Sequence, residues 1–142
     1  MSTPKRIHLL GEGRHEEAVA AGAITPGMLI NQNSAGAVVV HPTAGGWAEK
    51  AFALEDALQG KTIADAYASG DRVSFVLGKS GDVVYAWLSG GEGATPDEFL
   101  TSNGDGTLKV ASSTDIRIAV PLEAVDASDS ADVNERIRVR LL

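Results

Sequence analysis

The sequence predicts an all-β protein: a small barrel or jelly-roll-like sandwich of about eight to ten short antiparallel strands, with an extended N-terminal arm. Glycine occurs 16 times among 142 residues and aromatic residues make up only 5%, which favours short strands and turns over long helices. Several apolar runs are bounded by turn residues. The length suits one core, so we expect residues 1–13 to form the arm and residues 14–142 a single β domain.

The expected arm begins with polar residues, continues with the apolar tetrad Ile7 to Leu10, and ends at two glycines, Gly11 and Gly13. A short apolar tetrad on a flexible tether can dock on its own domain or reach a neighbouring molecule. The sequence leaves both alternatives open.

The first third of the domain contains one helical signal and one hairpin signal. Residues 15–21 (HEEAVAA) predict a helical turn or two, which Gly22 ends. Pro26 and Gly27 then turn the chain into a strand that reaches Ile30. A turn at residues 31–36 and a strand at residues 37–41 complete a first hairpin.

A third strand is expected over residues 47–55, which carry Trp47, Phe52 and Leu54. Residues 56–70 mix a helical turn with loop. Within them, Ile63 and Tyr67 stand four positions apart, a spacing that places both on one face of a helix.

The plainest local signal is a central hairpin. Two apolar, β-branched and aromatic runs, Arg72 to Leu77 and Val83 to Leu88, are separated by the loop Gly78 to Asp82. Two strand patterns joined by a short glycine-containing loop predict an antiparallel hairpin. A hairpin alone is only marginally stable in water, so the other strands must cover it.

The remaining chain predicts short strands separated by turns. Thr95 and Pro96 could begin at most one helical turn. The further elements are a turn at residues 102–107, strands at 108–111 and 115–121, an acidic loop at 125–133 and a strand at 135–142. In that last strand Ile137, Val139 and Leu141 alternate with Arg136, Arg138 and Arg140, so we expect one buried face and one that meets solvent or an acidic partner surface.

Composition limits the classes of partner. There are 19 acidic and 12 basic residues, for a formal charge of −7, which disfavours direct contact with nucleic acid. The chain has no cysteine, which excludes disulfides and thiolate chemistry and fits assembly in a reducing cytoplasm. We find neither an apolar run of bilayer length nor a secretory signal pattern, so we expect a soluble, unprocessed chain with no membrane partner.

Each partial motif for catalysis or metal binding lacks a residue that the chemistry requires. Both Gly-Lys-Ser/Thr sequences lack the earlier glycine of a phosphate-binding loop, with Glu55 and Val73 in its place. A zinc pair starting at His15 would need a second histidine where Val19 stands, and the turn at residues 101–112 lacks the carboxylates of a calcium loop. We therefore expect no catalytic residues, no metal and no cofactor. Trp47 and Trp87 fit either core positions or a stacking platform for a ligand.

Three turn motifs carry a family resemblance. A proline-glycine turn enters a strand at residues 25–30, a Tyr-x-x-Gly-Asp-x-Val pattern leads into the hairpin at residues 67–73, and Ser-Asn-Gly-Asp-Gly forms a turn at residues 102–106. Together with the segment at residues 135–142, they resemble the small all-β capsid decoration (cement) proteins of tailed bacteriophages. The resemblance covers about two thirds of the chain and leaves out the first twenty residues.

The resemblance implies a mechanical function. The protein, made in the host cytoplasm, would sit on the outer capsid surface of the virion and bridge major capsid subunits as a homodimer or trimer. We predict that the arm and its neighbours make the contact with the capsid or a sister subunit, and that deleting residues 1–13 abolishes this contact while leaving the fold intact. The alternative is a carbohydrate-binding β module on a virion or cell surface, with Trp47 or Trp87 as its platform. The predicted contact residues are Lys5, Arg6, Ile7, His8, Leu9, Leu10 and Arg14.

Overall fold

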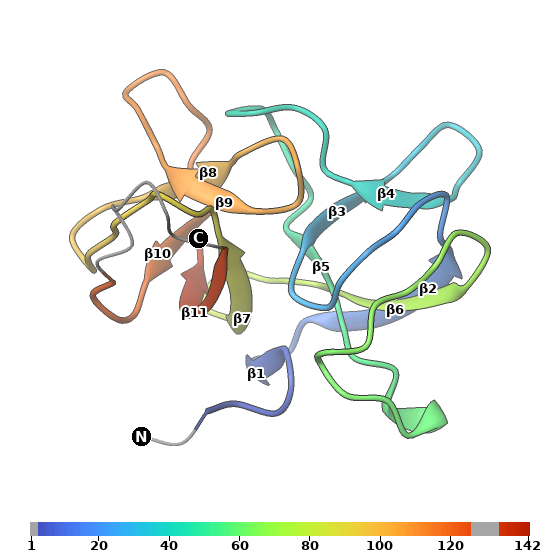
Figure 1. The fold of residues 1–142 in the computed structure, drawn as a ribbon. Coiled ribbons are helices and arrows are strands. Elements are labelled where there is room, and N and C mark those ends of the chain that lie inside the picture. Colours follow the sequence, from blue (N-terminus) through green and yellow to red (C-terminus); the bar gives the residue numbers. More distant parts are fainter. Residues whose placement is uncertain (1–2, 126–133) are drawn as a thin grey trace.

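The structure is a computed structural model that describes residues 3–125 and 134–142. Over these residues the chain forms 11 short strands and one three-residue 3₁₀ helix, η1. The strands form two curled sheets that lie side by side (Figure 1). The predicted all-β fold class is therefore confirmed, in the form of a small barrel with a second sheet beside it.

The first sheet closes into a barrel. Its strand order is β1-β7-β11-β10-β8-β9, and β9 also pairs with β7 through Leu88 and Leu108. Five strands thus form a closed ring, and β1 is added to the outer edge of β7. The strands are β1 (His8–Leu10), β7 (Val83–Leu88), β8 (Leu100–Ser102), β9 (Leu108–Val110), β10 (Ala119–Pro121) and β11 (Glu135–Leu141).

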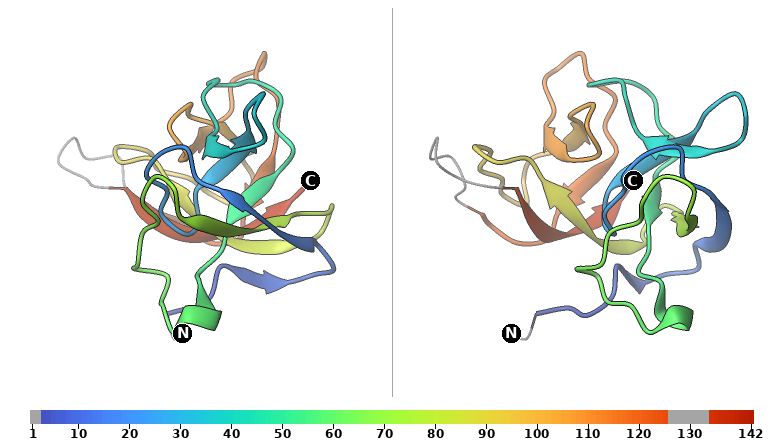
Figure 2. Two further views of the ribbon diagram at one scale, coloured as in Figure 1. Left: turned by 90° about the vertical axis from the view of Figure 1, so that its right-hand side faces the viewer. Right: turned by 45° about the vertical axis from the view of Figure 1, so that its right-hand side comes forward.

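The second sheet has the order β2-β6-β5-β3-β4 and also curls. Just beyond β2, the Ala21 N–H donates to the Val38 carbonyl at 2.9 Å, which brings the first strand of the order close to the last. Figure 2 shows this curl from two further sides. The elements are β2 (Arg14–Val19), β3 (Leu29–Gln32), β4 (Val38–Val40), β5 (Ala51–Ala53), η1 (Ala57–Gln59) and β6 (Arg72–Leu77).

Two hydrophobic clusters fill the fold, and β6 contributes to both. Val76 packs into the main core with Ile7, Phe52 and the inward side chains of the barrel strands. Phe75 points the other way, into a second core inside the curled sheet. Because successive side chains of a strand point to opposite faces, Val76 and Phe75 let β6 contribute to both cores.

The central hairpin prediction is right about the strands and wrong about their pairing. The strands β6 and β7 have the predicted bounds, but they belong to different sheets. Strand β6 pairs with β2 and β5, whereas β7 pairs with β11 and β1. The predicted loop is a crossover between sheets, in which the Gly78 N–H donates to Lys50 at 3.1 Å and the Gly81 N–H to Leu141 at 2.8 Å. Because other strands occupy the edges of both, the local hairpin does not form.

Two helical predictions are also wrong. Residues predicted as a helical turn form β2, which pairs with β6 along six residues. The edge of β6 provides backbone partners that a short isolated helix cannot match. Farther on, Ile63 packs against the main core whereas Tyr67 is buried in the second core, so they share no helical face. Only η1 is helical in that segment.

Other local predictions are confirmed. Strands β3 and β4 form the first hairpin, and β8 and β9 pair across the turn at residues 102–107. The strands β5 and β10 are shorter than expected, and residues 95–98 form a turn closed by the Glu98 N–H and Thr95 carbonyl at 3.0 Å. Beyond Val125, the predicted acidic loop lies outside the described residues.

Candidate functional site

The structure docks the expected arm on its own domain. Ile7 is fully buried in the main core, and its carbonyl accepts the Tyr85 N–H at 2.8 Å. The next three residues, including Leu9, form β1 on the edge of β7. Deleting residues 1–13 would remove this core side chain and strand, so the packing disagrees with the expectation that such a deletion leaves the fold intact.

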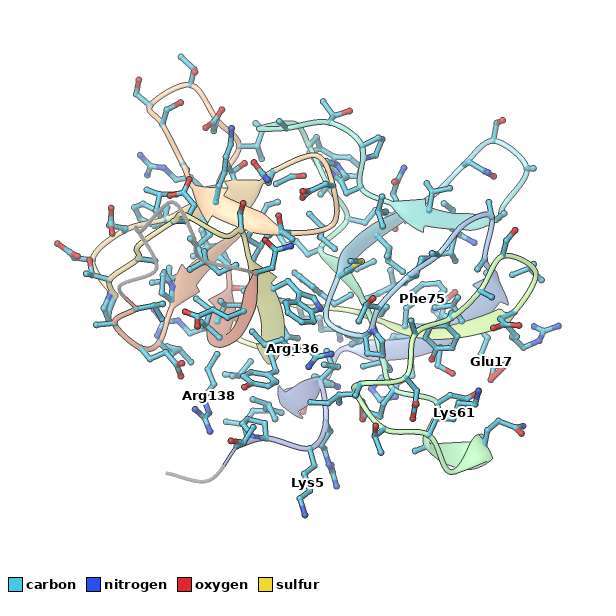
Figure 3. The ribbon with its side chains drawn as sticks, in the orientation of Figure 1. Lys5, Glu17, Lys61, Phe75, Arg136 and Arg138 are labelled. Atoms are coloured by element: carbon cyan, nitrogen blue, oxygen red, sulfur yellow. The ribbon has the colours of Figure 1, made fainter. Side chains whose placement is uncertain are left out.

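Residues 3–6 lie outside both core clusters. Lys5 and Arg6 are exposed, and Figure 3 shows the Lys5 side chain pointing away from the domain. Leu10, at the end of β1, is 67% exposed, and Arg14 is exposed at the start of β2. We call residues 3–6 the N-terminal segment. The structure thus separates one buried anchor from a surface that carries both basic and apolar side chains.

Two crossovers between the sheets meet around a buried carboxylate. Residues 11–13 connect β1 to β2, and residues 78–82 connect β6 to β7; we call this meeting point the sheet junction. Asp82 is only 3% exposed, and its carboxylate accepts backbone N–H groups of Glu12 and Lys79, each at 3.2 Å. A Cβ at Gly11 would lie 1.9 Å from Asp82 Oδ1, and one at Gly13 2.4 Å from Oδ2. Both glycines therefore make room for this carboxylate.

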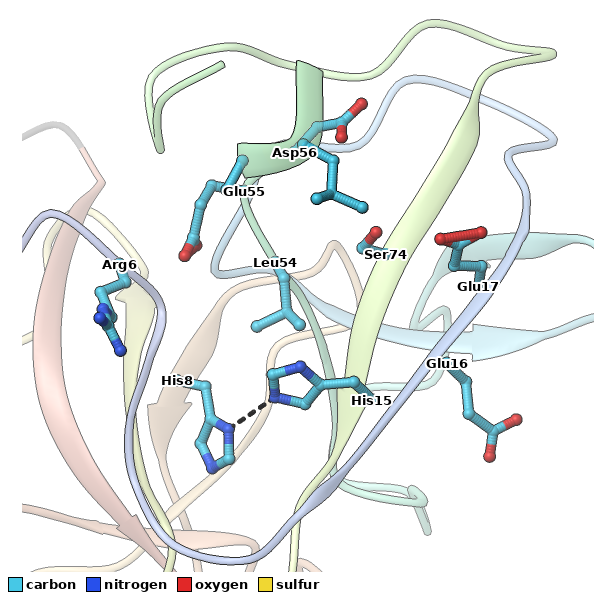
Figure 4. A pocket seen from close by; sticks show the side chains of 11 residues that line it. Arg6, His8, His15, Glu16, Glu17, Leu54, Glu55, Asp56 and Ser74 are labelled. Carbon is cyan, nitrogen blue, oxygen red and sulfur yellow. Dashed lines mark hydrogen bonds between the residues drawn. The ribbon is translucent and has the colours of Figure 1, made fainter. Parts of the chain in front are cut away.

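Two histidines continue the polar chain from Asp82. His8 Nε2 lies 3.4 Å from Asp82 Oδ2, and His8 Nδ1 lies 2.8 Å from His15 Nε2 (Figure 4). The side chain of His8 is 11% exposed, whereas His15 is exposed. Since β1 and β2 belong to different sheets, the contact between the imidazoles joins the two sheets beside the sheet junction.

A cleft of about 440 Å³ opens beside the histidine pair. Leu54 is buried at the back of the cleft and Leu58, at its rim, is 92% exposed. Glu55 reaches into the cleft in Figure 4 and accepts the Ile7 N–H at 3.1 Å. Within residues 3–125 and 134–142, no group of three or more side chains of the metal-binding types could hold a metal ion. The 2.8 Å contact between His8 Nδ1 and His15 Nε2 requires a hydrogen on one of these nitrogens and a lone pair on the other.

The two tryptophans have different surroundings. The Trp87 indole N–H donates to the Pro26 carbonyl at 2.9 Å, and the Arg136 guanidinium lies 4.2 Å from the ring centroid. The Arg136 side chain therefore covers one face of the Trp87 ring. Trp47 is 73% exposed, so a core position is wrong for this residue.

The arginines of β11 do not form one solvated face. Arg136 donates to the carbonyls of Pro26 and Ile63, and burial lowers its pKa. Arg138 lies 3.0 Å from a carboxylate oxygen of Glu123, and Arg140 is exposed. The opposite face is buried as predicted. The expected solvent-facing or partner-facing role is therefore wrong for Arg136, which packs on its own domain.

Sequence reasoning missed the cluster of Asp82, His8 and His15. Asp82 stands about seventy positions from both histidines, in a loop whose glycines indicate only a turn. The local signal that could have pointed to it is the Gly11 and Gly13 pair, since glycines so spaced allow a neighbouring group to approach closely.

No protein-family model and no curated protein matches this sequence. Among the described residues, no helix is long and apolar enough to cross a membrane.

Proposed function

We propose that this chain is a structural protein of a tailed-phage virion, which binds the outside of the capsid and bridges neighbouring major capsid subunits. The observation that carries the proposal is the anchored N-terminal segment. Ile7 fixes one end in the main core, while Lys5 and Arg6 stay exposed. Figure 3 shows Lys5 pointing away from the domain. A rigid domain with such a segment can hold on to a second protein.

Exposed apolar side chains support a contact role in addition to the basic residues. Trp47 is 73% exposed and Leu10 is 67% exposed, although moving either side chain out of water is favourable. Tryptophan in particular is enriched at the centres of protein interfaces. These side chains offer apolar contact area to a capsid subunit or to a second copy of the chain.

In this proposal the function is mechanical and the protein is not an enzyme. Copies that act as homodimers or trimers each contact two or more capsid subunits, so modest contacts combine into high avidity. The net charge of −7 keeps the chain away from the packaged nucleic acid, in agreement with a location on the outer surface. Synthesis in the host cytoplasm agrees with the absence of cysteine from the sequence.

The test is binding to undecorated capsids of the parent phage, followed by imaging of the particles. We expect additional density at fixed lattice points, and saturable binding. The double variant Lys5→Glu with Arg6→Glu should bind about tenfold more weakly or worse, because it reverses the charge of the segment.

A matched control reverses two exposed basic residues elsewhere, Lys79→Glu with Arg140→Glu. It changes the net charge by the same amount and should bind as the unaltered chain does. Absence of any binding by the unaltered chain would reject the capsid role. An equal loss of capsid binding in both double variants would show that the N-terminal segment is not the contact, although the capsid role would stand.

The exposure of Trp47 favours one second candidate, a carbohydrate-binding module in which this ring stacks on a sugar. Tryptophan fluorescence should then respond to a glycan panel, and Trp47→Ala should abolish the response. Fluorescence that does not change with any glycan, together with saturable capsid binding, would decide for the structural role.

A further inference from the structure

We infer that His8 and His15 form a proton-operated latch between the two sheets, which is closed while the pair carries at most one extra proton and opens when both imidazoles are protonated. The latch is a property of the free protein, so it does not depend on capsid binding. His8 belongs to the barrel sheet through β1, and His15 to the curled sheet through β2.

The position of the hydrogens follows from the contact distances. At 2.8 Å, one of the facing nitrogens, His8 Nδ1 and His15 Nε2, must carry a hydrogen and the other must offer a lone pair. The Asp82 carboxylate, 3.4 Å from His8 Nε2, favours a hydrogen on that nitrogen. His8 Nδ1 is then the acceptor, and His15 Nε2–H is the donor.

This arrangement accepts one added proton but not two. The first can bind His15 Nδ1, which leaves the hydrogen bond to His8 unchanged. The second must bind His8 Nδ1, and two N–H groups then point at each other across the contact. Two positive rings with centroids 5.1 Å apart also repel each other. The doubly protonated pair must therefore separate.

Charged groups around the pair can offset positive charge on the rings, but they cannot restore the lone pair that the contact between the two nitrogens needs. Asp82 is the carboxylate in direct contact with the pair, and its oxygens already accept two backbone N–H groups. Glu16 and Glu17 lie 3.4 Å and 3.9 Å from arginines of their own surface. The charged groups that line the cleft beside the pair are Arg6, Glu16, Glu17, Glu55 and Asp56.

Opening of the latch should loosen β1 and the sheet junction. Two backbone amides report on these places. The Tyr85 N–H donates to the Ile7 carbonyl at 2.8 Å, and the Glu12 N–H donates to Asp82 at 3.2 Å. The Ile118 N–H, which donates to the Leu100 carbonyl at 2.8 Å, is a reference, since neither residue lines the cleft beside the histidine pair.

The experiment is amide hydrogen exchange of the full chain by NMR, from about pH 8 to about pH 4, the interval that brackets ordinary histidine titration. We expect the protection factors of the Tyr85 and Glu12 amides to fall about tenfold or more relative to that of Ile118 as the pH falls. In His15→Gln they should stay high, because the glutamine amide can donate to His8 Nδ1 and takes up no proton.

The control variant is Glu17→Gln, which removes a titrating group from the same strand and keeps both imidazoles. It should lose protection in acid as the unaltered chain does. An equal loss in His15→Gln, or no loss in the unaltered chain, would overturn the latch. His15 is exposed, so its replacement leaves the core intact, which thermal unfolding at neutral pH verifies.

Discussion

At the scale of single residues, Tyr67 shows how burial sets a chemical property. Its side chain is 5% exposed in the second core, and its hydroxyl donates to the Leu54 carbonyl at 2.6 Å. Burial raises the pKa of Tyr67 to about 12, because the phenolate would lose solvation, and the nearby carboxylates of Asp56 and Glu55 add to this rise. The neutral form is therefore part of the folded structure.

The raised pKa predicts a loss of stability in strong alkali. The folded pKa of Tyr67 lies above that of the unfolded chain, about 10, so its contribution is fully present below pH 10 and lost as the pH rises toward 12. The difference of about two units corresponds to about 2–3 kcal/mol in the free energy of unfolding. Urea unfolding over this pH range measures it.

The variant Tyr67→Phe should lack this part of the alkaline loss. It should also be about 1 kcal/mol less stable at neutral pH, since the Leu54 carbonyl loses its donor. The matched control is Tyr85→Phe, which should keep the alkaline loss. The same pH dependence in Tyr67→Phe as in the unaltered chain would contradict this assignment.

At the scale of elements, the crossover between β6 and β7 depends on contacts with β11. A Cβ at Gly78 would lie 2.0 Å from Leu141 Cδ1 and 3.1 Å from the Lys50 carbonyl oxygen. The crossover therefore packs directly against Leu141 at the end of β11. No local sequence pattern specifies this contact. Close packing of this kind leaves little room for an added methyl group.

We expect Gly78→Ala to lower the free energy of unfolding by about 1–3 kcal/mol, because Leu141 must move. In a Leu141→Val background, which lacks the clashing Cδ1, the same change should cost about 1 kcal/mol less. Urea unfolding of the two single variants and the double variant measures this coupling.

Gly22→Ala is the matched control, since nothing lies within 4 Å of the position of its added Cβ. It should change stability by less than about 0.5 kcal/mol. Strictly additive effects of Gly78→Ala and Leu141→Val would show that the two positions do not contact each other.

At the scale of the whole molecule, two curled sheets share the main core, and the chain passes between them at the sheet junction. Within the N-terminal part that the structure describes, the main core receives the side chain of Ile7, and β1 follows directly after it. Residues from Ile7 onward therefore stabilise the fold, whereas the proposed partner contact lies in the residues before it.

This division predicts different results for two truncations. Removing residues 1–6 should leave the midpoint of urea unfolding nearly unchanged. Removing residues 1–13 should lower stability by about 3 kcal/mol or more, because it also removes the buried Ile7 side chain and β1. Equal midpoints for the two truncated chains would contradict the anchoring role of Ile7.

The sequence by itself determined the fold class, the bounds of β6 and β7, the β3–β4 hairpin and the buried face of β11. These features follow from alternation and turn chemistry, which act over a few neighbouring residues. Only the tertiary structure decided which strands pair, made β2 a strand and brought Asp82 to His8 and His15. Those outcomes depend on contacts between residues far apart in the sequence, where competition for strand edges and packing around a buried carboxylate outweighs local preference.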